Sequence, residues 1–246
     1  MVSSGLVDAA SGGRAIYPFV SIIMPALNEE KTVGKLILET SNLMSFHRLP
    51  FEVIVVDDCS SDGTHDEALR CGAVVLRNDQ NSGKGYCLRR ALEKARGDLI
   101  VMMDSDGEHL PTDIIRLLRH SFEGLDVVSG SRFLNGSTNF TSRIHFVGNQ
   151  IFNFVILILT GKRVTDSQTG FRVLKRKVID SLCLESDGFE IESEITVKSL
   201  MNGFSFKEVP INTKRREYGI SRVKMLSDGR KILKTIVRSI FAEVGH

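Results

Sequence analysis

The chain has 246 residues, with 42% hydrophobic and 25% charged side chains and a formal net charge of +2, which is the composition of a globular protein with one main domain. Its four cysteines form no CxxC pair and no charged-then-apolar leader precedes Phe19, which argues against a disulfide framework or a secretory signal and favours a reducing, cytoplasmic setting. The longest apolar run, residues 151–159, is too short to cross a bilayer as a helix, which takes roughly 20 residues.

The N-terminal residues 1–18 are rich in Ser, Gly and Ala without periodicity, which predicts a flexible tail. From Phe19 onward, short apolar runs alternate with segments of helical periodicity. We expect strands at 20–24, 53–56, 73–76, 99–103 and 127–128, and helices at 30–44, 66–70, 86–95 and 112–122. This alternation predicts an α/β fold with a mostly parallel central sheet flanked by helices.

After residue 133 the pattern changes. We expect an apolar helix at 144–159, a turn at Thr169-Gly170, a helix near 190–201, a strand at 206–211 and a long basic helix at the C-terminus. We take 19–222 as the main domain and 223–246 as a basic amphipathic helix.

The C-terminal segment concentrates positive charge, because residues 214–246 hold nine Lys or Arg against three acids. Its apolar residues recur at helical spacing, while Lys231, Lys234 and Arg238 fall largely on another face. Two interpretations are open: an interfacial helix on an anionic membrane, joined by the apolar helix 144–159, or a helix packed on the core with a solvated basic side.

Two acidic clusters follow predicted strands, where ligands of parallel sheets bind. Asp57-Asp58 follows the second strand, and Asp104 and Asp106 follow the fourth. Carboxylates that converge on one sheet edge repel one another, and a Mg²⁺ relieves this by sharing one or two carboxylates with substrate phosphates. The D-x-D therefore predicts an anchor for a metal-bound diphosphate, and the alternative is a pair of solvated loop acids.

The segment 81–85 reads N-S-G-K-G but is not a Walker loop, because Asn78 and Gly85 stand where that motif needs Gly and Ser or Thr. A dinucleotide-binding loop is excluded as well, since the third Gly is missing. Gly83 and Gly85 permit close backbone approach to a ligand at a helix start, with Lys84 as a cation. The alternative is a flexible turn that enters the helix.

Taken in order, seven segments resemble the inverting family 2 glycosyltransferases, and within them the polyprenyl-phosphate sugar synthases such as the dolichyl-phosphate mannose synthases. The resemblance covers roughly residues 19 to 225. The matching segments are V-S-I-I-M-P-A-L-N-E (20–29), V-V-D-D-C-S-S-D-G-T (55–64), N-S-G-K-G (81–85), D-S-D (104–106), S-G-S-R (129–132), D-S-Q-T-G-F (166–171) and R-E-Y-G-I-S (216–221).

This resemblance implies a GT-A fold that binds a nucleotide-sugar donor with Mg²⁺ or Mn²⁺. The nucleoside would lie on Pro25, Asn28, Glu29 and Asp57, and the other donor-binding positions would be Asp58, Lys84, Ser105, Arg132, Arg216, Ser221 and Arg222. Asp104 and Asp106 would bind the metal and the diphosphate. Glu108 would be a third ligand at a position where these enzymes usually have Gln, and Gly107 replaces an apolar residue, so the choice of donor is open.

The resemblance also implies an acceptor, a polyprenyl or dolichyl phosphate at a membrane surface. Arg132, Arg143 and Arg216 match positions that bind its phosphate, which suits planar guanidinium groups. Ser221 follows the family pattern, whereas Arg222 stands where a Lys is common. We therefore expect a peripheral enzyme on the cytoplasmic face of a membrane, held by surface contacts or by a small membrane-protein partner.

A lipid phosphate is already an anion and needs little help from a general base, so alignment and charge stabilisation would supply the catalysis. A sugar-hydroxyl acceptor would instead require a carboxylate to remove its proton. Asp166 is the candidate for that role, and the alternative for this residue is ordering of its own loop.

Other classes of protein fit less well. A nucleotidyltransferase would need a Gly-rich, basic loop after the first strand, which we do not find. A non-catalytic nucleotide-binding relative is disfavoured by retention of both Asp104 and Asp106. We expect no nucleic-acid partner, since aromatic residues make up only 7% of the chain and no recognition module is found.

Overall fold

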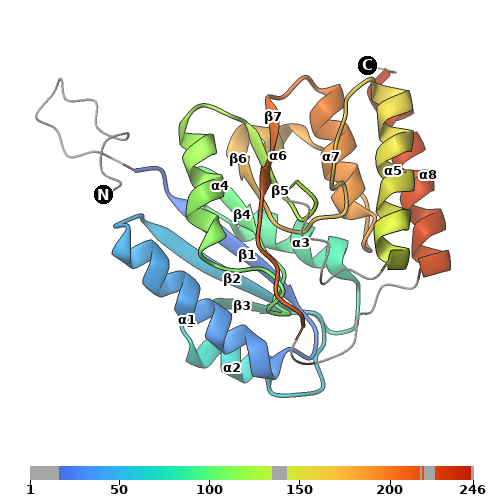
Figure 1. Ribbon diagram of the computed structural model, residues 1–246. Helices are drawn as coiled ribbons and strands as arrows, with labels where there is room; N and C mark the ends of the chain where they lie inside the picture. The colour runs from blue at the N-terminus through green and yellow to red at the C-terminus, as the bar shows by residue number, and fades with distance from the viewer. Residues whose placement is uncertain (1–16, 135–142, 217, 219–224, 245–246) are drawn as a thin grey trace, which may run out of the picture.

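The computed structural model describes residues 17–134, 143–216, 218 and 225–244, so most of the expected flexible tail lies outside the described residues. It contains one seven-stranded sheet in the order β3-β2-β1-β4-β6-β5-β7 (Figure 1). The strands are β1 Val20–Ala26, β2 Phe51–Asp57, β3 Val74–Arg77, β4 Leu99–Met102, β5 Val127–Ser131, β6 Arg172–Lys175 and β7 Phe206–Pro210. The helices are α1 Glu30–Phe46, α2 Thr64–Arg70, α3 Lys84–Lys94, α4 Asp113–Phe122, α5 Arg143–Thr160, α6 Arg176–Ser181, α7 Ile191–Met201 and α8 Met225–Val244.

Every strand pair is parallel except those of β6, which runs antiparallel to both β4 and β5. The predicted α/β class and mostly parallel sheet are confirmed. The short elements β6 and α6 were not expected from the sequence. A fully buried Arg172 begins β6 and interrupts the apolar pattern that identifies the other strands.

The sheet is covered on both faces, which explains why its central strands are apolar at successive positions. Ile22, Met24 and Val101 contribute to a buried cluster with α1 and α4, while Ile23 and Ile100 point into a second cluster with α3 and α7. Because the strands are parallel and paired in register, the residues that follow β1, β2 and β4 meet at one edge of the sheet.

The C-terminal helix α8 lies beside α5 and also contacts α7 (Figure 1). Ile232, Ile236 and Ile240 are buried in a cluster that the three helices share, with Ile156 and Val197 as partners. The interpretation that this apolar stripe faces a membrane is therefore wrong, because its side chains pack against α5 and α7 of the same chain. The alternative interpretation, a packed helix with a basic outer side, matches the structure.

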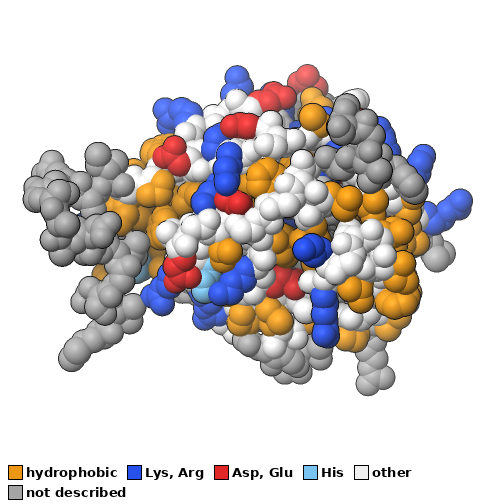
Figure 2. Space-filling view, turned by 90° about the horizontal axis from the view of Figure 1, so that it is seen from above, with side chains coloured by type: hydrophobic (Ala, Val, Ile, Leu, Met, Phe, Trp, Pro, Cys, Tyr) orange, Lys and Arg blue, Asp and Glu red, His pale blue; other side chains and the backbone are white. Residues whose placement is uncertain are grey.

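Helix α5 differs from α8, because large apolar side chains remain exposed along its outer face: Val147, Ile151, Phe154 and Ile158. Figure 2 shows hydrophobic side chains gathered at the side of the molecule where α5 and α8 lie. Within the described residues, no helix combines the length and the hydropathy that a membrane span requires.

Candidate active site

The ends of β1 and β2 bring the predicted nucleoside residues together. Pro25 pairs with Val56 across the strands, and Ala26 pairs with Asp57. Asn28 adopts a left-handed backbone with φ of 56°. Its Oδ1 accepts a hydrogen bond from the Ser61 amide at 2.8 Å, and its own amide donates to Ser60 Oγ at 2.9 Å. These bonds hold the two strand-end loops against each other.

Asp57 and Asp58 are both buried, but they do different work. Asp57 Oδ1 accepts a hydrogen bond from the Ser60 amide at 2.9 Å, and Asp57 Oδ2 lies 3.4 Å from Arg77 Nε. Asp58 accepts hydrogen bonds from the amides of Ser82 and Gly83, each at 2.8 Å. Asp58 thus positions the loop that immediately precedes Lys84.

The structure shows a packing reason for glycine at positions 83 and 85. A Cβ at Gly83 would lie 2.5 Å from the carbonyl oxygen of Asp187, and one at Gly85 would collide with the carbonyl oxygen of Ser186. The backbone at both glycines therefore packs closely against the chain's own loop before α7. Gly83 also has a φ of 94°, which L side chains rarely adopt.

Lys84 lies at the centre of a buried ionic network. Its Nζ is 2.5 Å from Asp104 Oδ1 and 2.8 Å from Glu192 Oε1. Arg172 reaches the other oxygen of Glu192 at 3.0 Å. Burial alone would raise the pKa of Asp104, but the neighbouring ammonium group of Lys84 outweighs it and the pKa falls to about 2. Asp104 is therefore ionised at neutral pH.

Glu192 and Arg172 were not predicted from the sequence, although both are buried and charged beside the predicted site. The available signal was weak. Glu192 and Glu194 stand between Ile191 and Ile195 in the segment I-E-S-E-I, and an acid inside a buried helix needs a buried partner. Arg172 follows directly on the D-S-Q-T-G-F segment.

Asp106 forms an ion pair with Arg216, and Arg216 Nε also lies 3.6 Å from Glu108 Oε1. Burial raises the pKa of Glu108, and repulsion from the carboxylate of Asp106 raises it further. Ser105 sits between the two acids of the D-x-D and donates a hydrogen bond to the Pro25 carbonyl at 2.7 Å. The D-x-D is thus fixed to the end of β1.

These carboxylates suit a divalent cation in their chemistry but are not arranged around one. Within the described residues, no three His, Cys, Asp or Glu side chains are grouped so as to hold a metal ion. Asp104, Asp106 and Glu108 nevertheless supply the hard oxygen donors that Mg²⁺ and Mn²⁺ prefer, and the raised pKa of Glu108 reports a repulsion that a cation would relieve. Lys84 engages Asp104 through Oδ1, and Arg216 engages Asp106 through Oδ2.

Arg132 follows β5 and forms a two-point ion pair with Asp166. Burial lowers the pKa of Arg132, but Asp166 and then Glu108 and Asp104 outweigh this and raise it. Arg132 is therefore attracted by Asp104, which pairs with Lys84, and by Glu108, which lies beside Arg216. The Arg143 side chain, Ser221 and Arg222 lie outside the described residues, so their assigned roles remain predictions.

Three features now lie at one edge of the sheet: strand-end loops held together by Asn28, a D-x-D tied to β1, and guanidinium groups beside its acids. The model of glycosyl transferase family 2 matches residues 21–183. The chain belongs to this family. It is a glycosyltransferase, as the resemblance of its motifs predicted.

Two similar proteins from archaea are named as dolichyl-phosphate or dolichol-phosphate transferases. The chain is 29% identical to UDP-N-acetylglucosamine--dolichyl-phosphate N-acetylglucosaminyltransferase of Methanococcus voltae, covering 87% of this chain and 92% of that protein. It is also 29% identical to dolichol-phosphate mannosyltransferase of Pyrococcus furiosus, covering 83% of this chain and 59% of that protein. The chain therefore spans little more than half of the mannosyltransferase.

Among solved structures, glucosyl-3-phosphoglycerate synthase from Mycobacterium tuberculosis, in complex with Mn²⁺, uridine diphosphate and phosphoglyceric acid, superposes with a TM-score of 0.73. The two are 22% identical, over 91% of this chain and 78% of that one. This likeness supports the GT-A fold that the motifs implied.

Proposed function

We propose that this glycosyltransferase moves a hexose, with inversion, from a nucleotide sugar of the GDP-mannose or UDP-glucose type to a polyprenyl or dolichyl phosphate. The observation that carries the proposal is the state of Asp166. Both of its oxygens accept hydrogen bonds from Arg132, and Oδ1 accepts another from Asn149 at 3.2 Å. Both oxygens of this carboxylate are therefore already engaged by the chain itself, whereas an acceptor that is already an anion needs no general base.

In the proposed reaction, an oxygen of the lipid phosphate attacks the anomeric carbon of the donor. The new carbon–oxygen bond forms as the bond to the nucleotide diphosphate breaks, and the diphosphate leaves with the electron pair. Arg132 and Arg216 align the acceptor phosphate. Lys84 holds Asp104 in place, and the loops at Asn28 and Glu29 hold the nucleoside.

We further propose Mg²⁺ or Mn²⁺ as the cofactor, held by Asp104 and Asp106, with Glu108 as a third oxygen donor. A bound divalent cation would neutralise charge on the departing diphosphate. The Mn²⁺ named for the glucosyl-3-phosphoglycerate synthase complex supports this choice, since that protein shares the fold.

The second candidate function, transfer to a sugar hydroxyl, is favoured by one observation. Asp166 is a carboxylate in contact with Arg132, one of the proposed acceptor residues, although its side chain is completely buried. To act as a base it would first have to leave Arg132 and Asn149.

We place the enzyme at the cytoplasmic face of a membrane, because its proposed acceptor resides there. The exposed apolar face of α5 supports this placement, and a small membrane-protein partner that covers the same face is the alternative means of attachment.

The proposal is tested by incubating purified protein with Mg²⁺ or Mn²⁺, a panel of nucleotide sugars and either a short-chain polyprenyl phosphate or a free oligosaccharide. The panel contains GDP-mannose, UDP-glucose and UDP-N-acetylglucosamine. We expect a lipid-linked product with one donor and none in excess chelator. A product that forms on the oligosaccharide and not on the lipid phosphate would refute the proposed acceptor.

A further inference from the structure

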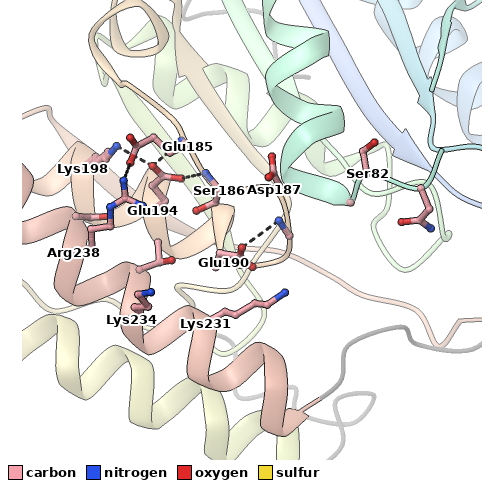
Figure 3. Close-up of a pocket in the computed structure, with 15 residues that line it drawn as sticks. Ser82, Glu185, Ser186, Asp187, Glu190, Glu194, Lys198, Lys231, Lys234 and Arg238 are labelled. Carbon is pink, nitrogen blue, oxygen red and sulfur yellow. Dashed lines mark hydrogen bonds and ion pairs between the residues drawn. The ribbon is translucent and has the colours of Figure 1, made fainter. Parts of the chain in front are cut away.

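A cavity of about 510 Å³ lies behind the site, between α8, the loop before α3 and the segment that precedes α7. In Figure 3, α8 forms one wall with Lys231, Lys234 and Arg238, and the segment from Glu185 to Glu190 faces it. This cavity contains none of the residues assigned to the donor, metal or acceptor. A ligand in this cavity would therefore leave the proposed donor, metal and acceptor positions unoccupied.

The basic residues of the cavity are not all neutralised. Arg238 pairs with Glu185 at 2.8 Å, and Lys198 pairs with Glu194 at 2.8 Å. Within the described part of the chain, Lys231 has no ion pair, and the same holds for Lys234. The two ammonium groups come from adjacent turns of α8, so they can approach one anion together.

The wall formed by residues 185–190, which faces α8, indicates what kind of anion fits the cavity. Glu185, Ser186, Asp187 and Glu190 line this wall, and Asp187 also pairs with Arg89. Thr235 lines the cavity from α8. Carboxylates repel an extended anionic surface such as a bilayer or a nucleic-acid backbone. They accept hydrogen bonds from hydroxyl groups, so a compact ligand with one phosphate and several hydroxyls matches both walls.

Two segments that line the cavity continue along the chain into residues of the candidate active site. Ser82 and Gly83 line it, and the next residue is Lys84, which contacts Asp104. Glu190 lines it as well and precedes the first turn of α7, which carries Glu192. A ligand that pulls these segments together acts on Lys84 and on one of its partners, Glu192.

We infer that this cavity binds a compact phosphorylated polyhydroxy ligand of the sugar-phosphate class, with its phosphate on Lys231 and Lys234, and that occupancy changes donor affinity through the Lys84 segment. Binding itself does not rest on the proposed transferase reaction. Only the change in donor affinity does, so the two failures are distinguishable.

The test is calorimetric titration of the full chain with glucose 6-phosphate, glucose and inorganic phosphate, with and without saturating GDP or UDP. We expect glucose 6-phosphate to bind, glucose not to bind, and nucleotide to be bound at the same time with altered affinity. The double variant Lys231→Ala, Lys234→Ala should weaken sugar-phosphate binding by about tenfold or more, since two charge-assisted contacts are lost. Lys231→Arg, Lys234→Arg should retain it.

A matched double variant, Lys94→Ala with Lys207→Ala, removes two exposed lysines outside the cavity and should bind like the wild type. Thermal denaturation of each variant checks folding, and amide NMR shifts at Ser82 and Gly83 locate the ligand. Equal binding of glucose 6-phosphate by wild type and Lys231→Ala, Lys234→Ala would overturn the site. Lysine-dependent binding to phosphatidylglycerol vesicles without binding to sugar phosphate would overturn the compact-ligand assignment, and unchanged nucleotide affinity would overturn the coupling.

Discussion

Arg132 meets Asp166 in a two-point ion pair, with Nε 2.7 Å from Oδ2 and the second guanidinium nitrogen 2.8 Å from Oδ1. Asp166 is completely buried, and the amides of Thr165 and Asp166 are in turn held by Glu208 at 2.7 and 2.8 Å. The guanidinium group is thereby fixed in orientation while its other N–H groups remain available for phosphate.

Replacing Arg132 by Lys keeps the charge but loses the planar fork. We expect the KM for lipid phosphate to rise by about tenfold, and the affinity for nucleotide to change by less than about twofold. Steady-state kinetics with a short-chain acceptor and calorimetry with nucleotide measure the two effects. Equal losses of both would count against an acceptor role for Arg132.

Asp166→Asn distinguishes the two acceptor classes. The amide preserves the size of the side chain and one of its two acceptors, so transfer to a lipid phosphate should fall by only about tenfold or less, through loosening of Arg132. If Asp166 is a general base for a hydroxyl acceptor, the same change should cost about 100-fold or more. Asp66→Asn, an exposed change on α2, is the control and should leave transfer unaltered.

Asp104→Ala and Asp106→Ala should each abolish transfer while the protein stays folded, because both acids sit at a strand end outside the apolar core. The measurement is product formation over a range of Mn²⁺ and Mg²⁺ concentrations, with circular dichroism to check folding. Turnover at the wild-type rate by either variant, or by the wild type in excess chelator, would contradict the metal proposal.

Gly170 sets the space available to the ionic pair in the site. A Cβ at this position would lie 2.6 Å from Asp104 Oδ2 and 2.6 Å from Lys84 Nζ. Gly170→Ala should therefore displace both groups and lower kcat by about tenfold or more, with a smaller effect on stability. Gly148→Ala is the matched control, since nothing lies within 4 Å of its added Cβ and α5 tolerates alanine. Full activity in Gly170→Ala would show that the observed pair is not needed.

The sequence predicted the sheet edge well because strand-end loops are adjacent by topology. Once β1, β2 and β4 are parallel, Asn28, Asp57 and Asp104 must converge. It could not predict which carboxylate pairs with which cation, because such pairs join residues far apart in the chain. Glu192 reaches Lys84 only through the packing of α7 on the sheet.

Periodicity also failed to separate two amphipathic helices. Both α5 and α8 show apolar stripes, and a stripe does not reveal what covers it. The structure buries Ile236 of α8 and exposes Phe154 of α5. The sequence had instead favoured the C-terminal helix as the main membrane-facing element. The glycines at 83 and 85 illustrate the same limit, since their close contact with a loop about 100 residues away in the chain cannot be predicted from the sequence.

Stability at acidic pH should depend on Asp126. Its carboxylate contacts Lys177 at 2.8 Å and Lys175 at 3.2 Å and accepts a hydrogen bond from the Ser205 amide. Burial opposes ionisation, but these partners outweigh it and lower the pKa from 3.8 to about 2.

A lowered folded-state pKa stabilises the protein above the unfolded value and loses this effect as pH falls through the folded value. Asp126→Asn should therefore reduce the free energy of unfolding by about 1–2 kcal/mol at pH 7. The difference from wild type should shrink between pH 3.8 and about 2. Urea unfolding at several pH values measures it, and a difference that stays constant down to pH 2 would contradict the assignment.

The outer face of α5 should bind a membrane. Val147, Ile151, Phe154 and Ile158 form a stripe at helical spacing, with Phe154 60% and Ile158 64% exposed. The inner face of the same helix contacts the loop that carries Asp166, because Asn153 donates a hydrogen bond to the Thr165 carbonyl at 2.8 Å. A lipid phosphate bound at Arg132 would therefore lie near the inner side of a helix whose outer face is apolar.

Phe154→Asp with Ile158→Asp should weaken flotation with anionic liposomes by about tenfold or more, since burying each apolar side chain contributes about 1.5–3 kcal/mol. Turnover with a short, soluble polyprenyl phosphate should stay near the wild-type value, because neither side chain touches the site. Phe46→Asp with Leu69→Asp is the matched control: both are exposed apolar residues on α1 and α2, and their loss should not change flotation. If the wild type ignores liposomes at low salt, and no membrane partner recruits it, the lipid acceptor loses its support and the sugar-hydroxyl acceptor gains it.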